Sequence, residues 1–137
     1  MTDDVARVAI AVVEQSGYYL VGTRKADEAL AGHAEFPGGK CLPGEEATVC
    51  AMRECREETS LAVVAARRLY ACRHTYGHGS LDLEFWLCRP EQMIIDLSQP
   101  VENGFRWVPA QVLKSLHFPT ANEPVIRLLS ADAHSVG

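Results

Sequence analysis

Alternating apolar and polar positions along the chain predict a set of β-strands. The clearest alternation covers residues 81–88, where every second side chain is large and apolar, as on a strand with one buried face. Residues 5–13 are dense in β-branched side chains and predict a buried strand, and residues 18–23 predict a second strand after a turn. Shorter strands are predicted over residues 61–64, 69–74 and 104–108, with a polar loop at 24–33 and a hairpin loop at 74–80.

Three helices are predicted between and after these strands. Good helix formers run from Glu45 to Thr59, and the charges of Glu45 and Glu46 suit the positive end of a helix dipole. A brief helix follows Pro109, and a final helix covers residues 122–133. Strands around one central helix, with a second helix at the end of the chain, predict an α/β fold with a mixed sheet between helices. No repeat or linker is present, so residues 1–137 are predicted to form a single domain.

The predicted helix at residues 45–59 carries three carboxylates on one side. Glu54, Glu57 and Glu58 are spaced three and four residues apart and therefore share a face. Like charges at this spacing destabilise a helix by about 0.2–0.5 kcal/mol, and partial burial raises the cost. A hard divalent cation, Mg²⁺ or Mn²⁺, would turn the repulsion into attraction. The alternative is a solvated acidic helix face.

Two further features, a glycine turn before the helix and an apolar ridge beside the acids, favour a metal site over a solvated face. A Pro-Gly-Gly turn at residues 37–39 precedes the helix, and its glycines let backbone carbonyl oxygens approach a ligand closely. Arg53 lies one turn before Glu57 and can hold that side chain in one rotamer. Beside the acids runs a ridge of small residues that can pack against a sheet, formed by Ala47, Ala51 and Cys55.

Composition and charge restrict the partners and the compartment. The net charge of −5 argues against sustained binding to polymeric nucleic acid, but a nucleotide can bring its own metal ions. The five cysteines are odd in number and include no Cys-x-x-Cys pair, which favours reduced thiols. The start of the chain is acidic, with no basic segment before an apolar run, and its longest apolar run is too short for a membrane span. A cytoplasmic protein without membrane contact is expected, as a monomer or a homodimer.

The stretch from Gly39 to Leu61 resembles the signature box of the Nudix hydrolases. It holds a glycine, five residues, Glu45, seven residues and then Arg-Glu-Cys-Arg-Glu-Glu-Thr-Ser-Leu, and it matches every charged position of the box. It departs at Cys55, where the family has a larger aliphatic residue, and at Ser60, where the family has glycine. If the helix ends through a left-handed residue at Ser60, the serine is strained where glycine would not be.

This resemblance implies the α/β/α sandwich of the Nudix fold and a hydrolase that depends on Mg²⁺, with Mn²⁺ as the other candidate. It implies metal ligands at Glu54, Glu57, Glu58 and the carbonyl oxygen of Gly38. Arg53 would orient Glu57, and both Glu54 and Glu57 are candidates for the carboxylate that accepts a proton from water.

Other segments resemble the MutT-type 8-oxo-dGTP pyrophosphohydrolases, namely residues 35–40, 85–87 and 117–126. That resemblance implies hydrolysis of 8-oxo-dGTP to 8-oxo-dGMP and pyrophosphate, which sanitises the nucleotide pool and serves DNA repair. Asn122 would read the oxidised base through its amide, and capping of the final helix is a second reading that does not exclude the first. The substrate-binding residues expected from the resemblance are Arg24, Lys25, Glu35, Phe36, Pro37, Gly38 and Asn122.

Several assignments stay open at this point. Arg24 and Lys25 are also explained as solvated cations at a strand end. The family places an acid near Trp107, but Arg106 precedes that tryptophan here, so Glu102 is the nearest substitute. Trp86 and Trp107 are expected in the core or at its rim rather than as platforms for a base. His74 and His78 are expected in a loop rather than at a zinc site.

Two other functions compete with the MutT-type assignment. The first is a Nudix hydrolase for another nucleotide, such as CTP or dCTP, ADP-ribose or a dinucleoside polyphosphate. The second is a nucleotide-sensing module that has kept the fold but not the catalysis. All box carboxylates are present in this chain, which favours catalysis over sensing.

Overall fold

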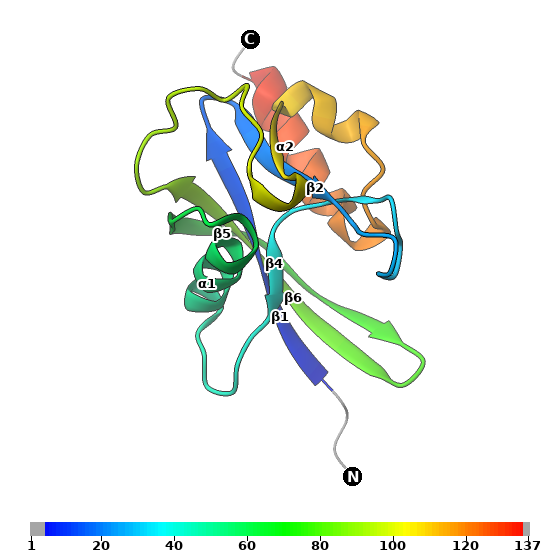
Figure 1. Ribbon diagram of the computed structural model, residues 1–137. Helices are drawn as coiled ribbons and strands as arrows, with labels where there is room; N and C mark the ends of the chain where they lie inside the picture. Colours follow the sequence, from blue (N-terminus) through cyan, green and yellow to red (C-terminus); the bar gives the residue numbers. More distant parts are fainter. Residues whose placement is uncertain (1–4, 136–137) are drawn as a thin grey trace.

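The computed structural model describes residues 5–135, whose strands form a mixed sheet of seven strands. The sheet order is β3-β2-β1-β6-β5, with β4 beside β1 and β7 beside β2 (Figure 1). The strand β1 runs parallel to β6, and the other described pairs are antiparallel. The strands are β1 (Val5–Gln15), β2 (Tyr18–Thr23), β3 (Ala34–Glu35), β4 (Gly38–Lys40), β5 (Val63–Tyr76), β6 (Gly79–Pro90) and β7 (Arg106–Pro109).

Helices cover both faces of this sheet. The two α-helices are α1 (Ala47–Thr59) and α2 (Glu123–Ser135), and the three 3₁₀ helices are η1 (Glu102–Gly104), η2 (Ala110–Ser115) and η3 (Thr120–Asn122). A separate hydrophobic core lies under each α-helix, so the sheet is the middle layer of an α/β/α sandwich. The fold implied by the sequence is therefore confirmed. Neither α-helix in residues 5–135 combines the length and apolar character needed to cross a membrane.

The central strand β1 separates the two cores through its alternating side chains. Ala9, Ala11 and Val13 are fully buried on the α1 side, and Val12 is fully buried on the α2 side. Alanines on this face allow close approach of α1, whose own small residues, with Ala51 at its centre, form the expected ridge. The result is a short distance between α1 and the strands that carry the site.

The structure corrects several boundaries. The helix α1 begins at Ala47 rather than Glu45, because the Glu45 side chain folds back onto other partners and Glu46 serves as N-cap. The predicted hairpin loop at residues 74–80 is a two-residue turn, and the strand pieces predicted at 61–64 and 69–74 are one continuous strand with two irregularities. The brief helix after Pro109 is a 3₁₀ helix.

The glycine turn predicted at residues 37–39 is also corrected. Gly38 and Gly39 form the short strand β4, which pairs with Ile10 and Ala9 of β1. They are required for close approach rather than for a turn. A Cβ on Gly38 would lie 2.7 Å from the carbonyl oxygen of Ala9, and one on Gly39 would lie 2.5 Å from Oε1 of Glu54.

Ser60 ends α1 in the left-handed conformation. Its φ is 63° and its backbone N–H donates to the carbonyl oxygen of Arg56 at 2.8 Å. The helix therefore ends through a left-handed residue, as it would with glycine, rather than through the slightly different exit expected for serine, and a residue with a Cβ is strained at this position. The prediction of reduced cysteines also agrees with the structure, since all five are free.

Candidate active site

A single guanidinium holds acidic side chains just before α1 and in its second half. Arg53 donates from Nε and Nη2 to the two oxygens of Glu45, at 2.8 and 2.9 Å. Its Nη1 donates to Oε2 of Glu54 and to Oε2 of Glu57, both at 3.0 Å. Nη2 also reaches the carbonyl oxygen of Lys40 at 3.2 Å, which ties the helix to β4. Arg53 thus fixes two of the three box carboxylates, including the predicted contact with Glu57.

The ion pair of Arg53 and Glu45 stays charged over the whole physiological range. Hydrogen bonds from Arg53, and then from the backbone of Leu42, lower the pKa of Glu45 to about 2. Hydrogen bonds to Glu45 and Glu57 raise the pKa of Arg53 above its usual value. The pair is therefore a permanent support for the carboxylates beside it rather than a group that titrates during a reaction.

The carboxylate of Glu58 lies in surroundings that disfavour its charged form. Burial first, and then the nearby charges of Glu35 and Glu54, raise the pKa of Glu58 to about 8, while the Gly38 backbone opposes the shift by hydrogen bonding. Acidic side chains are thus gathered around β4 with too little positive charge to balance them. Oxygen ligands at this density fit a hard divalent cation, because its charge would remove the repulsion. The residues present therefore suit the metal that the box implies.

Glu35 is a member of this acidic cluster that sequence reasoning assigned only to substrate binding. It is half-buried, and burial followed by the charge of Glu28 raises its pKa, while Arg24 lowers it. Nη1 of Arg24 lies 3.3 Å from Oε1 of Glu35. The charge of Glu35 also acts on Glu58. The sequence contained no local signal for this role, because β3 and α1 are brought together only by the fold.

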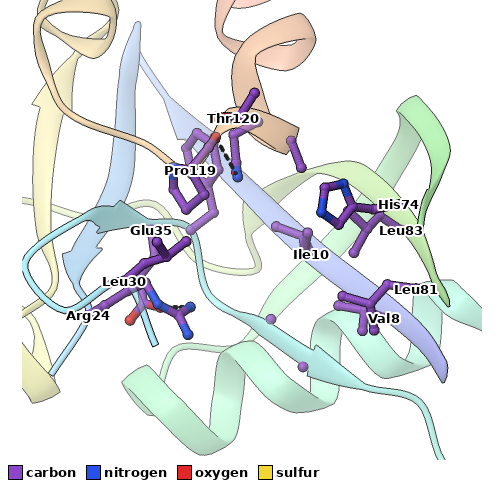
Figure 2. A pocket seen from close by; sticks show the side chains of 15 residues that line it. Val8, Ile10, Arg24, Leu30, Glu35, His74, Leu81, Leu83, Pro119 and Thr120 are labelled. Carbon is purple, nitrogen blue, oxygen red and sulfur yellow. Dashed lines mark hydrogen bonds and ion pairs between the residues drawn. The ribbon is translucent and has the colours of Figure 1, made fainter. Parts of the chain in front are cut away.

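A cavity of about 510 Å³ opens on the α2 side of β4 and has an apolar floor (Figure 2). Ile10 lies between two walls, with Arg24 and Glu35 on one side and His74 and Leu83 on the other. Its size is within the range of small-molecule sites. The residues that line it are Val8, Ile10, Arg24, Leu30, Glu35, Phe36, Gly38, Gly39, His74, Leu81, Leu83, Pro119, Thr120, Ala121 and Asn122. We call it the apolar cavity.

A second cavity of about 510 Å³ lies beside the first and is lined mostly by charged residues. Its lining residues are Arg24, Lys25, Asp27, Glu28, Glu35, Gly38, Glu58, Asn103 and Phe105. Three residues, Arg24, Glu35 and Gly38, belong to both cavities. We call the second one the charged cavity. A ligand with an apolar ring and a charged tail can therefore extend from one cavity into the other.

Most of the predicted substrate-binding residues meet in these two cavities, with one exception. Arg24, Glu35 and Gly38 lie where the cavities join, and Lys25 lines the charged cavity. The exception is Pro37, which is fully buried and lines neither cavity; its carbonyl oxygen accepts the N–H of Ala11 at 2.8 Å. Pro37 therefore supports β4 from within the core.

Phe36 and Asn122 define the wall of the apolar cavity nearest α2. Phe36 is buried and stacks on Phe118, with ring centroids 4.9 Å apart. Nδ2 of Asn122 donates to the carbonyl oxygen of Pro119 at 3.3 Å (Figure 2). Among residues 5–135, the Asn122 side chain makes this hydrogen bond and no other. The alternative reading, in which Asn122 caps the final helix, is therefore not observed.

Glu102, the nearest substitute for the acid expected near Trp107, lies in the 3₁₀ helix η1. Glu102 is exposed and lines neither of the two cavities. Its neighbour Asn103 lines the charged cavity instead, and donates from Nδ2 to the backbone carbonyl of Glu58. Asn103 was missed from the sequence, although its positive φ of 58° is a conformation that asparagine adopts readily.

The aromatic residues and histidines largely follow the sequence predictions. Trp107 is buried in the core under α1, and Trp86 packs partly buried against the same core. His78 lies in the turn between β5 and β6, whereas His74 is part of β5 and lines the apolar cavity. His74 is thus a potential ligand contact from a strand rather than from a loop.

The fold packs a carboxylate-bearing helix against a glycine strand inside an α/β/α sandwich. The NUDIX domain model matches residues 8–128, and the chain belongs to the Nudix hydrolase family. Nudix hydrolases generally use divalent metal ions and act on small-molecule nucleotide substrates.

Known proteins similar to this chain include an 8-oxo-dGTP diphosphatase and proteins named MutT. The chain is 29% identical over 126 residues to the 8-oxo-dGTP diphosphatase of Escherichia coli strain K12. The aligned region covers 90% of this chain and 95% of that protein. Its fold is similar to that of a MutT protein from Methanosarcina mazei Go1, with a TM-score of 0.76, 16% identity and coverage of 97% and 98% of the two chains. It is also similar to MutT from methicillin-resistant Staphylococcus aureus 252, with a TM-score of 0.75, 22% identity and coverage of 96% and 99%. At such identities, the two structures show the shared fold.

Proposed function

We propose that the protein is a Mg²⁺-dependent nucleoside triphosphate pyrophosphohydrolase that converts 8-oxo-dGTP to 8-oxo-dGMP and pyrophosphate. Its role would be to remove oxidised purine nucleotides from the precursor pool. The observation that carries the proposal is the junction of the apolar and charged cavities at Arg24, Glu35 and Gly38. A purine would occupy the first cavity while its phosphates extend into the second. The 8-oxo-dGTP diphosphatase activity named for the Escherichia coli relative supports the choice of substrate.

The apolar cavity suits an oxidised purine through its floor and its amide wall. Ile10 and Leu83 provide apolar surface for a flat ring. Asn122 lies at the rim with one amide hydrogen bond already made, to Pro119, so its carbonyl oxygen and second N–H are available to the edge of a base. Oxidation at C8 turns a purine nitrogen from an acceptor into a donor, and an amide oxygen is the acceptor that would read this change.

The metal ligands in this proposal are Glu54, Glu57, Glu58 and the carbonyl oxygen of Gly38, with Glu35 as an additional acid nearby. When bound, Mg²⁺ or Mn²⁺ would neutralise phosphate charge and lower the pKa of a water molecule. Of these groups, Glu58, Gly38 and Glu35 line the charged cavity, and Arg24 and Lys25 on its lining would supply cations for the phosphate oxygens. A metal held by Glu58 and the Gly38 carbonyl oxygen would therefore face the triphosphate.

The proton from the attacking water goes to Glu54 or Glu57. Arg53 occupies Oε2 of both side chains, so Oε1 of each is the atom available to accept it. Glu54 is partly buried over Gly39, whereas the Glu57 side chain is 58% exposed. Arg53 acts as a positioning residue, since its nitrogens are occupied by Glu45, Glu54, Glu57 and Lys40. Attack at the β-phosphorus would release the nucleoside monophosphate and pyrophosphate.

The test is pyrophosphate release from a panel of normal and oxidised nucleoside triphosphates, with CTP, ADP-ribose and a dinucleoside polyphosphate included. We expect turnover with Mg²⁺, none with a chelator, and loss of turnover in Glu57→Gln. The matched control is Glu46→Gln, because Glu46 is an exposed acid at the start of the same helix without a side-chain cap hydrogen bond. Undiminished turnover in Glu57→Gln would refute the metal-site assignment. A faster reaction with another nucleotide would make that nucleotide the substrate in place of 8-oxo-dGTP.

A further inference from the structure

Three side chains of types that can bind a metal, two thiols and one carboxylate, converge beside Arg53. Sγ of Cys41, Sγ of Cys50 and a carboxylate oxygen of Glu45 all lie within 4.8 Å of one another. Cys41 directly follows β4 and Cys50 lies in the first turns of α1, so the loop between strand and helix brings the two thiols together. We call this group the thiol cluster. The nucleotide reaction proposed above uses neither thiol.

The backbone around the thiol cluster is held in place. The N–H of Cys41 donates to the carbonyl oxygen of Arg7 at 2.8 Å, which anchors it beside β1. The thiol of Cys50 lies 3.5 Å from the carbonyl oxygen of Gly39, and its residue is fully buried. Glu45 accepts hydrogen bonds from Arg53 and from the N–H of Leu42, the latter at 2.9 Å. The ligand atoms are thus preorganised by the fold, as a metal site requires.

We propose that Cys41, Cys50 and Glu45 form a binding site for a thiophilic divalent cation of the zinc and cadmium class. Two sulfur ligands select this class over Mg²⁺, which prefers oxygen. Three protein ligands and one open position make a common tetrahedral arrangement for zinc. The site differs in ligand chemistry from the all-oxygen site of Glu54, Glu57 and Glu58.

Charge and distance both agree with a divalent ion in the thiol cluster. Two thiolates and one carboxylate carry three negative charges, of which a divalent cation balances two; the Arg53 guanidinium, 3.9 Å from Sγ of Cys50, lies beside the cluster and is shared with Glu54 and Glu57. In a tetrahedral zinc site with bonds of about 2.3 Å, neighbouring sulfur atoms lie about 3.8 Å apart. The cluster would therefore contract by about 1 Å at most around an ion. Cys41 is partly exposed, which leaves a path for the ion to enter.

Metal binding by this pair of thiols needs no oxidant, whereas disulfide formation does. Burial, and then a hydrogen bond with Cys41, raise the pKa of the Cys50 thiol to about 12. Because the thiolate is the metal ligand, binding should strengthen as the pH rises. A divalent cation displaces the thiol proton itself: each S–H bond is exchanged for a metal–sulfur bond, both protons go to solvent, and nothing is oxidised.

The experiment titrates the reduced full-length chain with Cd²⁺ alone, in excess Mg²⁺ so that the oxygen site is filled. Thiolate-to-cadmium charge transfer is read in the ultraviolet, because carboxylates give no such band. We expect the band to saturate at one Cd²⁺ per chain and about two protons to be released with it. In Cys41→Ser, apparent affinity should fall by at least about tenfold with a weaker band.

The matched control is Cys72→Ser, since Cys72 is also a partly exposed free thiol but lies on β5 outside the thiol cluster. This variant should keep the band and the affinity. Cys41→Ala is a second variant that removes the ligand without offering an oxygen. The proposal is overturned if no saturable band forms, or if Cys41→Ser and Cys41→Ala bind Cd²⁺ as the unaltered chain does. The readout does not involve turnover, so its result is independent of the proposed nucleotide substrate.

Discussion

Arg53 and Glu45 form a two-point ion pair, in which Nε and Nη2 of the guanidinium donate to both carboxylate oxygens at 2.8 and 2.9 Å. These two hydrogen bonds fix the plane of the guanidinium. The remaining nitrogen, Nη1, is then aimed at Glu54 and Glu57. Lysine offers a point charge without this fork, so it cannot hold three carboxylates in the same geometry.

Replacing Arg53 by lysine should therefore lower kcat more than it changes KM. Loss of the fork lets Glu54 and Glu57 move, and small misplacements of this kind cost about 100-fold in rate. Steady-state kinetics of Arg53→Lys with saturating Mg²⁺ measures the effect. The control is Arg56→Lys, an exposed residue on the same helix. An unchanged kcat in Arg53→Lys would show that the acids are positioned without Arg53.

The two glycines of β4 should respond differently to the same substitution. In Gly39→Ala the new Cβ meets the end of the Glu54 side chain, which can move. We expect a preserved fold but a loss of kcat of roughly 10- to 100-fold, because a box carboxylate is displaced. In Gly38→Ala the new Cβ meets the backbone of Ala9 and Ile10, which cannot move alone. Here the free energy of unfolding should fall by about 1–3 kcal/mol.

Denaturant unfolding and kinetics of the two glycine variants separate these outcomes. Gly77→Ala is the control, because a Cβ at Gly77 meets nothing within 4 Å. Equal losses of stability in Gly38→Ala and Gly39→Ala would contradict the assigned contacts.

Replacing Ser60 by glycine should stabilise the protein. Ser60 ends α1 at a φ of 63°, and the strain of a Cβ there exceeds the extra freedom that glycine has in the unfolded chain. The expected gain is about 1 kcal/mol in the free energy of unfolding, measured by chemical denaturation. Ser60→Ala keeps the Cβ and should show no such gain. If both variants were equally stable, strain at this residue would not be the cause.

The metal-free protein should become less stable as the pH rises above the ordinary pKa of glutamate. The folded-state pKa of Glu58 is raised, to about 8, so the native state holds a proton that the unfolded chain has already released. The contribution of this group is complete below the ordinary glutamate pKa of 4.5 and is lost as the pH rises through about 8. The raised pKa of Glu35 acts in the same direction.

Thermal unfolding with a chelator and with Mg²⁺, at pH about 5 and pH about 9, measures this linkage. Mg²⁺ should raise Tm more at the higher pH, because the ion replaces the proton as the partner of Glu58. The variant Glu58→Gln should lose most of this pH dependence, and Glu46→Gln should keep it. A Mg²⁺ effect that is equal at both pH values would contradict the role given to Glu58.

The fold and the box could be predicted because their signals are local in the sequence. The alternation of residues 81–88 required a half-buried strand, and the spacing of Glu54, Glu57 and Glu58 required one helix face. The helix start was misplaced for a tertiary reason. Glu45 has good helix propensity, but its ion pair with Arg53 and its hydrogen bond from Leu42 hold it outside α1.

The parts of the site that were missed depend on contacts between distant segments. Glu35 acts on Glu58 only because β3 is paired with β2 and lies near the end of α1. Asn103 reaches the backbone of Glu58 from a 3₁₀ turn whose sequence gives no sign of that contact. The role of Gly38 and Gly39 as a strand, rather than a turn, was likewise set by their partners on β1.

The most direct test of the account compares kcat/KM for 8-oxo-dGTP and dGTP in the unaltered chain and in Asn122→Ala, with Gln111→Ala as an exposed amide control. The account predicts a clear preference for 8-oxo-dGTP that falls by about 10- to 100-fold in Asn122→Ala, while hydrolysis of dGTP and the control variant are unchanged. Equal kcat/KM for the two nucleotides in the unaltered chain would contradict it.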